Sequence, residues 1–159
     1  MNSLHEYLAN GVLDLDDLDL PTEEQLHKGV AITECIQLIP CNPCVDICPV
    51  KAITMKDINS PPIVDFDRCT GCTLCVGICP GLAIFVVKHN DDETAHITLP
   101  YEFTPVPKKG DLVTVLDRWG KPHGEAIVLN VRTKQKTAVI TIQVPIDQAM
   151  HIRNIKVTP

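Results

Sequence analysis

The alternation of hydrophobic and polar residues divides the chain of 159 residues into dissimilar parts. Residues 12–20 alternate leucine with aspartate, a pattern that fits neither a clean helix face nor a convincing strand. Short apolar runs between cysteine-rich loops follow, and longer β-branched runs separated by polar turns come last. We therefore expect four segments: an acidic arm at residues 1–29, a small mixed domain at residues 30–89, a linker at residues 90–106 and a small all-β domain at residues 107–159.

The mixed domain contains an internal repeat, because Cys48-Pro49 and the apolar residues after it recur as Cys79-Pro80 with a similar continuation. Each half is expected to form a short strand, a cysteine loop, a short helix and a returning strand. The expected strands lie at residues 30–33, 53–56, 63–66 and 83–88. A domain of this size buries too little apolar surface to be stable alone, so bound metal would supply part of its core.

The C-terminal segment is expected to be antiparallel, with three clear β-branched runs and one weaker run. These runs lie at residues 112–116, 126–131, 137–144 and 151–157. The polar segments 117–120 and 133–136 have the composition of hairpin turns. The pattern predicts a small β-barrel or a curled sheet.

The N-terminal arm holds most of the excess negative charge, with seven acidic residues against one lysine in residues 1–29. Thr22 and Gln25 have the spacing of a capping box at the start of a short helix, which Gly29 would end. Two interpretations of the arm stay open. It is a solvated segment partly ordered on the rest of the protein, or a docking arm whose leucines bury against a partner.

Composition and charge exclude several classes of protein. The net charge of −6 argues against a nucleic-acid backbone as partner. No stretch approaches the roughly 18–20 apolar residues of a membrane span, and the N-terminus lacks the pattern of a secretory signal. Eight cysteines without such a signal indicate a reducing compartment, so we expect a cytoplasmic protein that uses its thiols for metal rather than for disulfides.

The eight cysteines form two groups, each ending in Cys-Pro, and the second has the spacing C-x2-C-x2-C-x3-C-P. This spacing is typical of a [4Fe–4S] cluster held by three close thiolates, with the fourth cysteine ligating the other cluster. We therefore predict two [4Fe–4S] clusters with crossed ligands. The first takes Cys35, Cys41, Cys44 and Cys79, and the second takes Cys69, Cys72, Cys75 and Cys48.

Cys35 is the weakest of these assignments, because five residues separate it from Cys41 where two are usual. It is assigned by elimination, as the remaining cysteine, and the longer loop needs only to bulge outward. The alternative is a [3Fe–4S] cluster, or a labile fourth iron, with Cys35 as a free thiol. Two all-thiolate zinc sites are a further alternative, which the close succession of three cysteines disfavours.

Residues 30–89 resemble a bacterial-type two-cluster [4Fe–4S] ferredoxin, on the strength of both cysteine motifs. The resemblance implies a pseudo-twofold (βαβ)2 ferredoxin fold and electron transfer without substrate chemistry. With residues 34–44 and 109–113 included, the chain is similar to small ferredoxin-type subunits of flavin-dependent dehydrogenases of the proline, hydroxyproline and sarcosine type. That similarity implies a flavoprotein dehydrogenase subunit as partner and leaves open a further iron–sulfur subunit. The expected fold class is thus α+β, a ferredoxin fold followed by a small antiparallel β-barrel-like domain.

Three functions compete at this point. The chain is a fixed electron-transfer subunit of an oxidoreductase complex, a free soluble ferredoxin that serves several enzymes, or a metal-stabilised scaffold. No phosphate-binding loop and no catalytic constellation are present, so we do not expect an enzyme in its own right. Arg118 and Trp119, in the first expected hairpin turn, are either ordinary exposed turn residues or an interface anchor.

Overall fold

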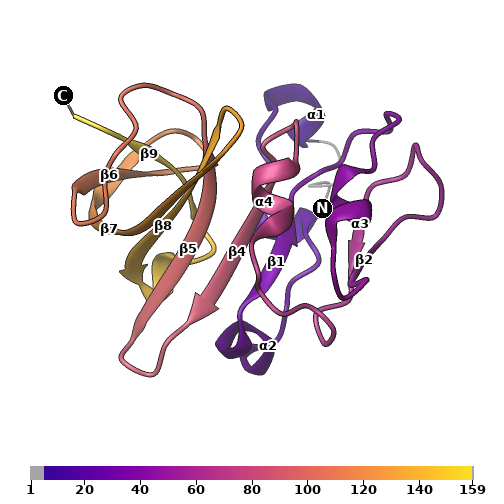
Figure 1. Ribbon diagram of the computed structural model, residues 1–159, viewed down its shortest axis with the longest axis horizontal. Helices are drawn as coiled ribbons and strands as arrows, with labels where there is room; N and C mark the ends of the chain where they lie inside the picture. Colours follow the sequence, from indigo (N-terminus) through magenta and orange to yellow (C-terminus); the bar gives the residue numbers. More distant parts are fainter. Residues whose placement is uncertain (1–5, 159) are drawn as a thin grey trace.

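The computed structural model describes residues 6–158, including every side chain in that range except that of Lys134. Most of the strands form one antiparallel sheet in the order β1-β4-β5-β8-β7-β6-β9, and β2 pairs with β3 in a second, two-stranded sheet (Figure 1). The strands are β1 (Val30–Thr33), β2 (Ile53–Thr54), β3 (Ile63–Val64), β4 (Ile84–His89), β5 (Thr94–Tyr101), β6 (Leu112–Asp117), β7 (Pro122–Lys134), β8 (Thr137–Pro145) and β9 (Ile152–Lys156).

The cysteine-rich part contains the sequence strand, helix, strand twice. The first half is β1, α3 (Pro43–Ile47) and β2, and the second is β3, α4 (Leu74–Ile78) and β4. The outer strands β1 and β4 pair with each other, the inner strands β2 and β3 pair with each other, and α3 packs against α4. All four expected strands are present, although β2 and β3 are shorter than expected. The pseudo-twofold ferredoxin fold itself stays a prediction.

The segment at residues 90–106, which was expected to be a linker, contains strand β5 (Thr94–Tyr101), an inner strand of the large sheet. This strand pairs with β4 on one side and with β8 on the other. The polar residues before it form a tight hairpin, closed by a 2.9 Å hydrogen bond from the Asn90 amide to the Thr94 carbonyl. Ala95, Ile97 and Leu99 alternate into the core, a period-two pattern that the neighbouring polar residues and prolines concealed. The cysteine-rich part and the C-terminal part therefore share one sheet.

The C-terminal strands β6, β7, β8 and β9 lie where the β-branched runs predict them. Both hairpin turns are confirmed as well, with Gly120 at φ +76° in the first and Gln135 at φ +58° in the second. The strands curl, so that β9 pairs with β6 and also contacts β5 (Figure 1). The core between them is aliphatic, as the low aromatic content predicts. Its largest fully buried side chains include Ile97, Leu99, Ile140, Ile142 and Ile152.

The acidic arm is ordered on the body of the protein in its second half. Its helices are α1 (Glu6–Asn10), the 3-10 turn η2 (Leu15–Asp17) and α2 (Glu23–Lys28). The predicted capping box is present, since the Thr22 amide donates to the Gln25 side chain at 2.9 Å and the Gln25 amide donates to the Thr22 hydroxyl at 3.3 Å. Helix α2 ends at Gly29 and packs on β4 with Leu26 buried, and the Lys28 ammonium donates to the Phe66 and Asp67 carbonyls. The docking role of the arm stays a prediction.

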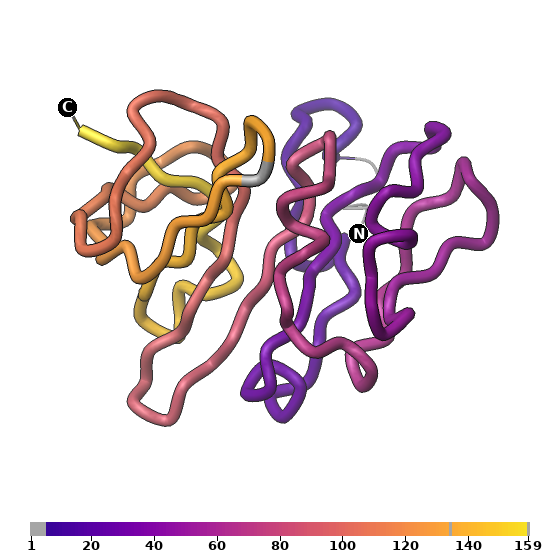
Figure 2. Tube along the Cα trace, in the orientation of Figure 1, coloured from indigo at the N-terminus to yellow at the C-terminus, as the bar shows by residue number. Residues whose placement is uncertain are grey.

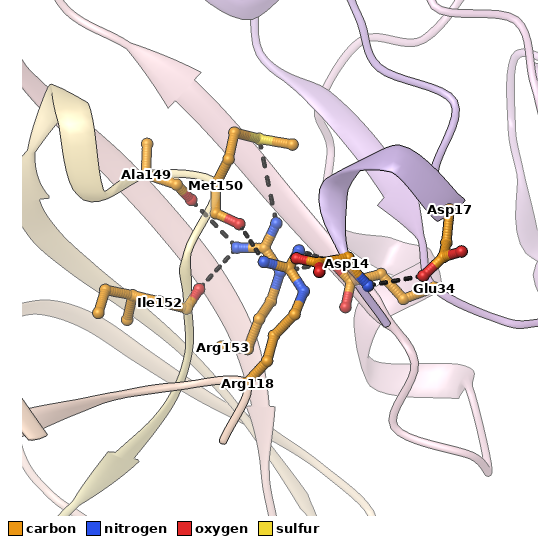
Figure 3. A network of polar contacts seen from close by, with 8 residues as sticks. All are labelled: Asp14, Asp17, Glu34, Arg118, Ala149, Met150, Ile152 and Arg153. Carbon is orange, nitrogen blue, oxygen red and sulfur yellow. Dashed lines mark hydrogen bonds and ion pairs between the residues drawn. The ribbon is translucent and has the colours of Figure 1, made fainter. Parts of the chain in front are cut away.

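A buried ion cluster links the cysteine-rich part to the C-terminal strands, and no sequence pattern predicted it. Glu34 follows β1, and its carboxylate accepts hydrogen bonds from Arg118 at 2.5 Å and from Arg153 at 2.6 Å (Figure 3). All three side chains are at most 10% exposed. Arg153 also donates to the carbonyls of Ala149 and Ile152 and lies 5.0 Å from the Phe85 ring centre. The Arg118 side chain is thus occupied by contacts within the chain, whereas the side chain of its neighbour Trp119 is 59% exposed.

Replacement of Glu34 should destabilise the protein strongly, because two buried guanidinium groups would lose their carboxylate. For Glu34→Ala we expect a loss of about 3–5 kcal/mol, the usual cost of breaking a buried ion pair from one side. At about 2–4 °C per kcal/mol for a chain of this size, the unfolding temperature should fall by about 10 °C. Thermal unfolding followed by circular dichroism under anaerobic conditions measures this unfolding temperature. The exposed Glu125→Ala is the control, and equal unfolding temperatures for the two variants would contradict the structural role of Glu34.

Candidate metal centre

One pocket collects four cysteines that come from both halves of the repeat. Cys69, Cys72 and Cys75 reach it from the loop after β3 and from α4, and Cys48 reaches it from the end of α3. Apolar side chains close the pocket around them; these are Ala31, Val50, Ile53, Leu74 and Val86. The structure therefore brings together the four cysteines that were predicted to share the second cluster.

The loop between Cys69 and Cys72 needs glycine at position 71. Gly71 has φ +65°, in the left-handed region that favours glycine. A Cβ atom built on it would lie only 2.8 Å from the carbonyl oxygen of Gly29, at the end of α2. The cysteine loop is thus pressed against the end of this helix, which fixes its position.

Backbone amides point at two sulfur atoms of this pocket. The Ala31 amide donates to the Cys69 sulfur at 3.3 Å, and the Ala52 amide donates to the Cys48 sulfur at 3.2 Å. Burial raises the pKa of Cys48, but hydrogen bonds from the backbone amides of residues 50–53 outweigh it and lower the pKa below its ordinary value. These amides favour the thiolate, the form that binds metal.

Cys75 has the opposite environment. Burial, with smaller contributions from Cys69 and Cys72, raises the pKa of the Cys75 thiol to about 12. A thiol in such surroundings loses its proton only when a positive charge takes the proton's place. A metal centre supplies that charge, since a coordinating thiol is deprotonated outright. The residues present therefore fit a metal-containing group.

The other four cysteines lie near one another beside this pocket. Burial raises the pKa of the Cys44 thiol to about 11, and Cys79, Cys41 and Cys35 add to the increase. Burial also raises the pKa of Cys35, where Cys79 and Cys41 contribute against a backbone hydrogen bond from Gln37. The structure thus places Cys35 with Cys41, Cys44 and Cys79, and the longer Cys35–Cys41 loop does not carry it away.

The spacing of the thiols disfavours the zinc alternative. With Zn–S bonds of about 2.3 Å, four thiolates around one zinc ion lie only about 3.8 Å apart. Among residues 6–158, no three His, Cys, Asp or Glu side chains lie close enough together to hold one metal ion. Four cysteines around one pocket, three of them in the succession C-x2-C-x2-C, match a polynuclear cluster better than a single ion. Their ligand roles remain a prediction.

None of the histidines in residues 6–158 lines this pocket. His89 is buried and lies 2.7 Å from the Glu23 carboxylate, with His27 at 3.4 Å from the same oxygen, so both serve the packing of α2 against β4.

In the described part of the chain, no helix is long and apolar enough to cross a membrane.

The cysteine-rich part matches a known family model. Residues 34–83 match the family described as a 4Fe-4S dicluster domain. This match confirms the prediction that the region is of the two-cluster ferredoxin type, which was made from the cysteine spacing. Residues 34–83 are thus of the 4Fe-4S dicluster type, and electron transfer is the chemistry of such domains.

Curated relatives are similar over the same region. The chain is 52% identical to an uncharacterized ferredoxin of Methanocaldococcus jannaschii over 44 residues, which are 28% of each chain. It is 41% identical to the ferredoxin-type protein NapF of Haemophilus influenzae over 72 residues, 41% of each chain. It is 28% identical to a selenate reductase subunit of Mesobacillus selenatarsenatis over 110 residues, which are 65% of this chain and 37% of the relative.

Each of these matches spans less than half of the relative's own length. No solved structure matches the chain. The similarity to flavin-dependent dehydrogenase subunits, which was drawn from residues 34–44 and 109–113, therefore stays a prediction.

Substitution of Gly71 should damage the centre through the loop rather than through a ligand. In Gly71→Ala the added methyl group would meet the Gly29 carbonyl, so the loop has to move away from α2. Gly120→Ala is a matched control, because Gly120 also has positive φ but has no atom within 4 Å of the added Cβ position. Both variants carry about 1–2 kcal/mol of left-handed strain. We expect Gly71→Ala alone to lose iron, measured per chain after anaerobic purification, and equal iron contents would contradict the close contact.

Proposed function

We propose that the chain is a fixed electron-transfer subunit with two [4Fe–4S] clusters, which relays electrons to or from a flavin in a larger oxidoreductase complex. The ligand sets are those predicted above, with Cys48 and Cys79 exchanged between the halves. When bound, such clusters supply one-electron transfer. The pocket that unites Cys48 with Cys69, Cys72 and Cys75 is the observation that carries this proposal.

The protein's own contribution is to hold the thiolates, exclude water and set the local electrostatics. Apolar residues around the pocket lower the local dielectric, and the Ala31 and Ala52 amides donate to cysteine sulfurs. Hydrogen bonds to sulfur and solvent exposure are among the factors that set cluster potentials. In this proposal the residues around the cysteines tune the potential, and none of them performs chemistry on a substrate.

A fixed subunit is favoured over a free ferredoxin by the amount of structure that does not hold cysteines. Strands β5 to β9 and the ordered arm are more than cluster binding requires. One relative is named as a subunit of a selenate reductase, which supports an assignment to a multi-subunit oxidoreductase. The flavin partner rests on the resemblance to proline-, hydroxyproline- and sarcosine-type dehydrogenase subunits. The alternative is a free ferredoxin, and the purification experiment below distinguishes it from a fixed subunit.

Exchange of ligands between the halves predicts which cluster each cysteine substitution damages. Cys48→Ser should disrupt the cluster of the second motif and leave the first largely intact. Cys79→Ser should do the opposite. Electron paramagnetic resonance of the reduced proteins, together with the iron content, separates the two signals. If Cys48→Ser removed only the signal that Cys41→Ser also removes, the crossed arrangement would be wrong.

Purification from the native source, without oxygen and under mild conditions, tests the fixed-subunit proposal. We expect a complex larger than 17.5 kDa that contains flavin and iron, and whose clusters are reduced when the complex turns over its substrate. A stable monomer with two reversible one-electron waves and no flavoprotein would favour the free ferredoxin. Clusters that take up no electrons would favour a scaffold.

A further inference from the structure

The residue before the first cysteine is held through its backbone. The Glu34 amide donates to the Ala83 carbonyl at 2.7 Å, directly beyond the last pair of the ladder between β1 and β4. Ala83 lies four residues after Cys79, which was predicted to ligate the same cluster as Cys35. This hydrogen bond therefore joins the segment that enters the first cysteine group to the segment that leaves the second.

The Glu34 side chain is held by the C-terminal strands. Its carboxylate accepts hydrogen bonds from Arg118, directly after β6, and from Arg153 on β9. Arg118 also donates to the Met150 carbonyl at 2.5 Å, and Arg153 donates to the Ala149 carbonyl at 3.0 Å. In Figure 3 the two guanidinium groups lie side by side next to the carboxylate. The carboxylate is thus bound by two side chains whose own positions are fixed by the chain before β9.

Cys35 lacks a restraint that the corresponding cysteine of the second group has. Two residues separate Cys69 from Cys72, and their loop is pressed against the end of α2. Five residues separate Cys35 from Cys41. The ends of a longer loop are less restricted by the loop itself. The position of Cys35 is therefore set mainly from its N-terminal side, where Glu34 is held by both backbone and side chain.

We propose that Glu34, bound by Arg118 and Arg153, is a positioning residue that holds Cys35 in place as the fourth ligand of the first cluster. This inference rests on the proposed function. Glu34 is not itself a ligand in this role, because it acts through the backbone of the residue that follows it. Loss of a residue that orients a metal ligand typically costs about 10–100-fold in metal affinity.

A contribution to overall stability alone would have a different signature. Loss of the ion cluster would then weaken the whole fold, and both clusters would lose iron together. A positioning role affects the first cluster alone, at the iron that Cys35 binds. Ferricyanide makes this difference measurable. It takes one electron from a [4Fe–4S]2+ cluster and becomes ferrocyanide, while the cluster releases one Fe2+ ion and becomes [3Fe–4S]+.

Ferricyanide treatment of the full chain, purified with its clusters and without oxygen, tests the proposal. In Glu34→Ala the first cluster should convert about tenfold faster than in wild type, because its fourth iron is held less firmly. Iron should fall from about eight atoms per chain to about seven, and the second cluster should stay intact. The readouts are the iron content and the electron paramagnetic resonance signal of the oxidised protein, in which only [3Fe–4S]+ is visible.

Two further variants separate position from stability. Arg118→Met leaves Glu34 paired with Arg153, so it covers the case in which Glu34→Ala does not fold, and it should speed conversion to a smaller extent. Ile155→Ala is the matched control, since Ile155 is 3% exposed on β9 and its truncation leaves the Glu34 contacts in place. Truncation of a buried isoleucine destabilises a protein about as much as loss of a buried ion-pair partner. Thermal unfolding of the variants checks this match.

Alkylation identifies the cysteine that is released. Ligation protects a thiolate from iodoacetamide, so in Glu34→Ala treated with ferricyanide Cys35 should be the first of the eight cysteines to be modified. Mass spectrometry of the digested protein locates the modified residue. Release of Cys69 or Cys72 instead would overturn the proposal, because these residues belong to the predicted second cluster.

The outcomes separate this inference from the proposed function. Faster release of one iron and of Cys35 in the ion-cluster variants, with Ile155→Ala like wild type, supports the positioning role. Equal conversion rates in Glu34→Ala and Ile155→Ala, or loss of both clusters together, overturn it while the proposed function stands. Rapid alkylation of Cys35 in untreated wild type also overturns it, since Cys35 would then not be a ligand. Wild type without iron–sulfur clusters contradicts the proposed function as well.

Discussion

In the proposed arrangement the cysteine-rich part depends on one constraint, which is that a tight cysteine loop can supply three thiolates to a cubane but not the fourth. The fourth has to come from a distant segment, and Cys48 at the end of α3 lies in the pocket of Cys69, Cys72 and Cys75. This arrangement joins α3 to α4 and the first half of the repeat to the second. A domain too small for a large apolar core is thereby held together by its predicted metal centre.

The rest of the chain acts as a support for that unit. Strand β5 extends the sheet from β4 to β8, so the C-terminal strands continue the sheet of the cysteine-rich part. Glu34, directly before Cys35, is held by two arginines from the C-terminal strands and their turns. The sheet and the ion cluster both fix the position of the segment that leads into the first cysteine group.

The sequence predicted features that depend on near neighbours in the chain. Cysteine spacing, the Thr22 capping box and the β-branched runs are local patterns, and the structure contains the elements that they predict. Strand β5 was missed because its polar turn and prolines obscured the alternating apolar residues Ala95, Ile97 and Leu99. The contact between Glu34 and Arg153 joins residues 119 positions apart, and no local sequence pattern predicts such a contact. The grouping of Cys35 with Cys79, by contrast, was predicted from the sequence by elimination.

Two cysteine groups with different surroundings fit a relay with two distinct ends. No charged residue occurs between Cys35 and Val45 in the first, whereas Arg132 donates to Thr73 in the second. The central claim, that the halves exchange ligands, is tested most directly by anomalous diffraction at the iron edge from crystals grown without oxygen. Two four-iron groups should appear, one bounded by Cys48 with Cys69, Cys72 and Cys75. Single metal ions, or a group bounded by the cysteines of one motif alone, would contradict the account.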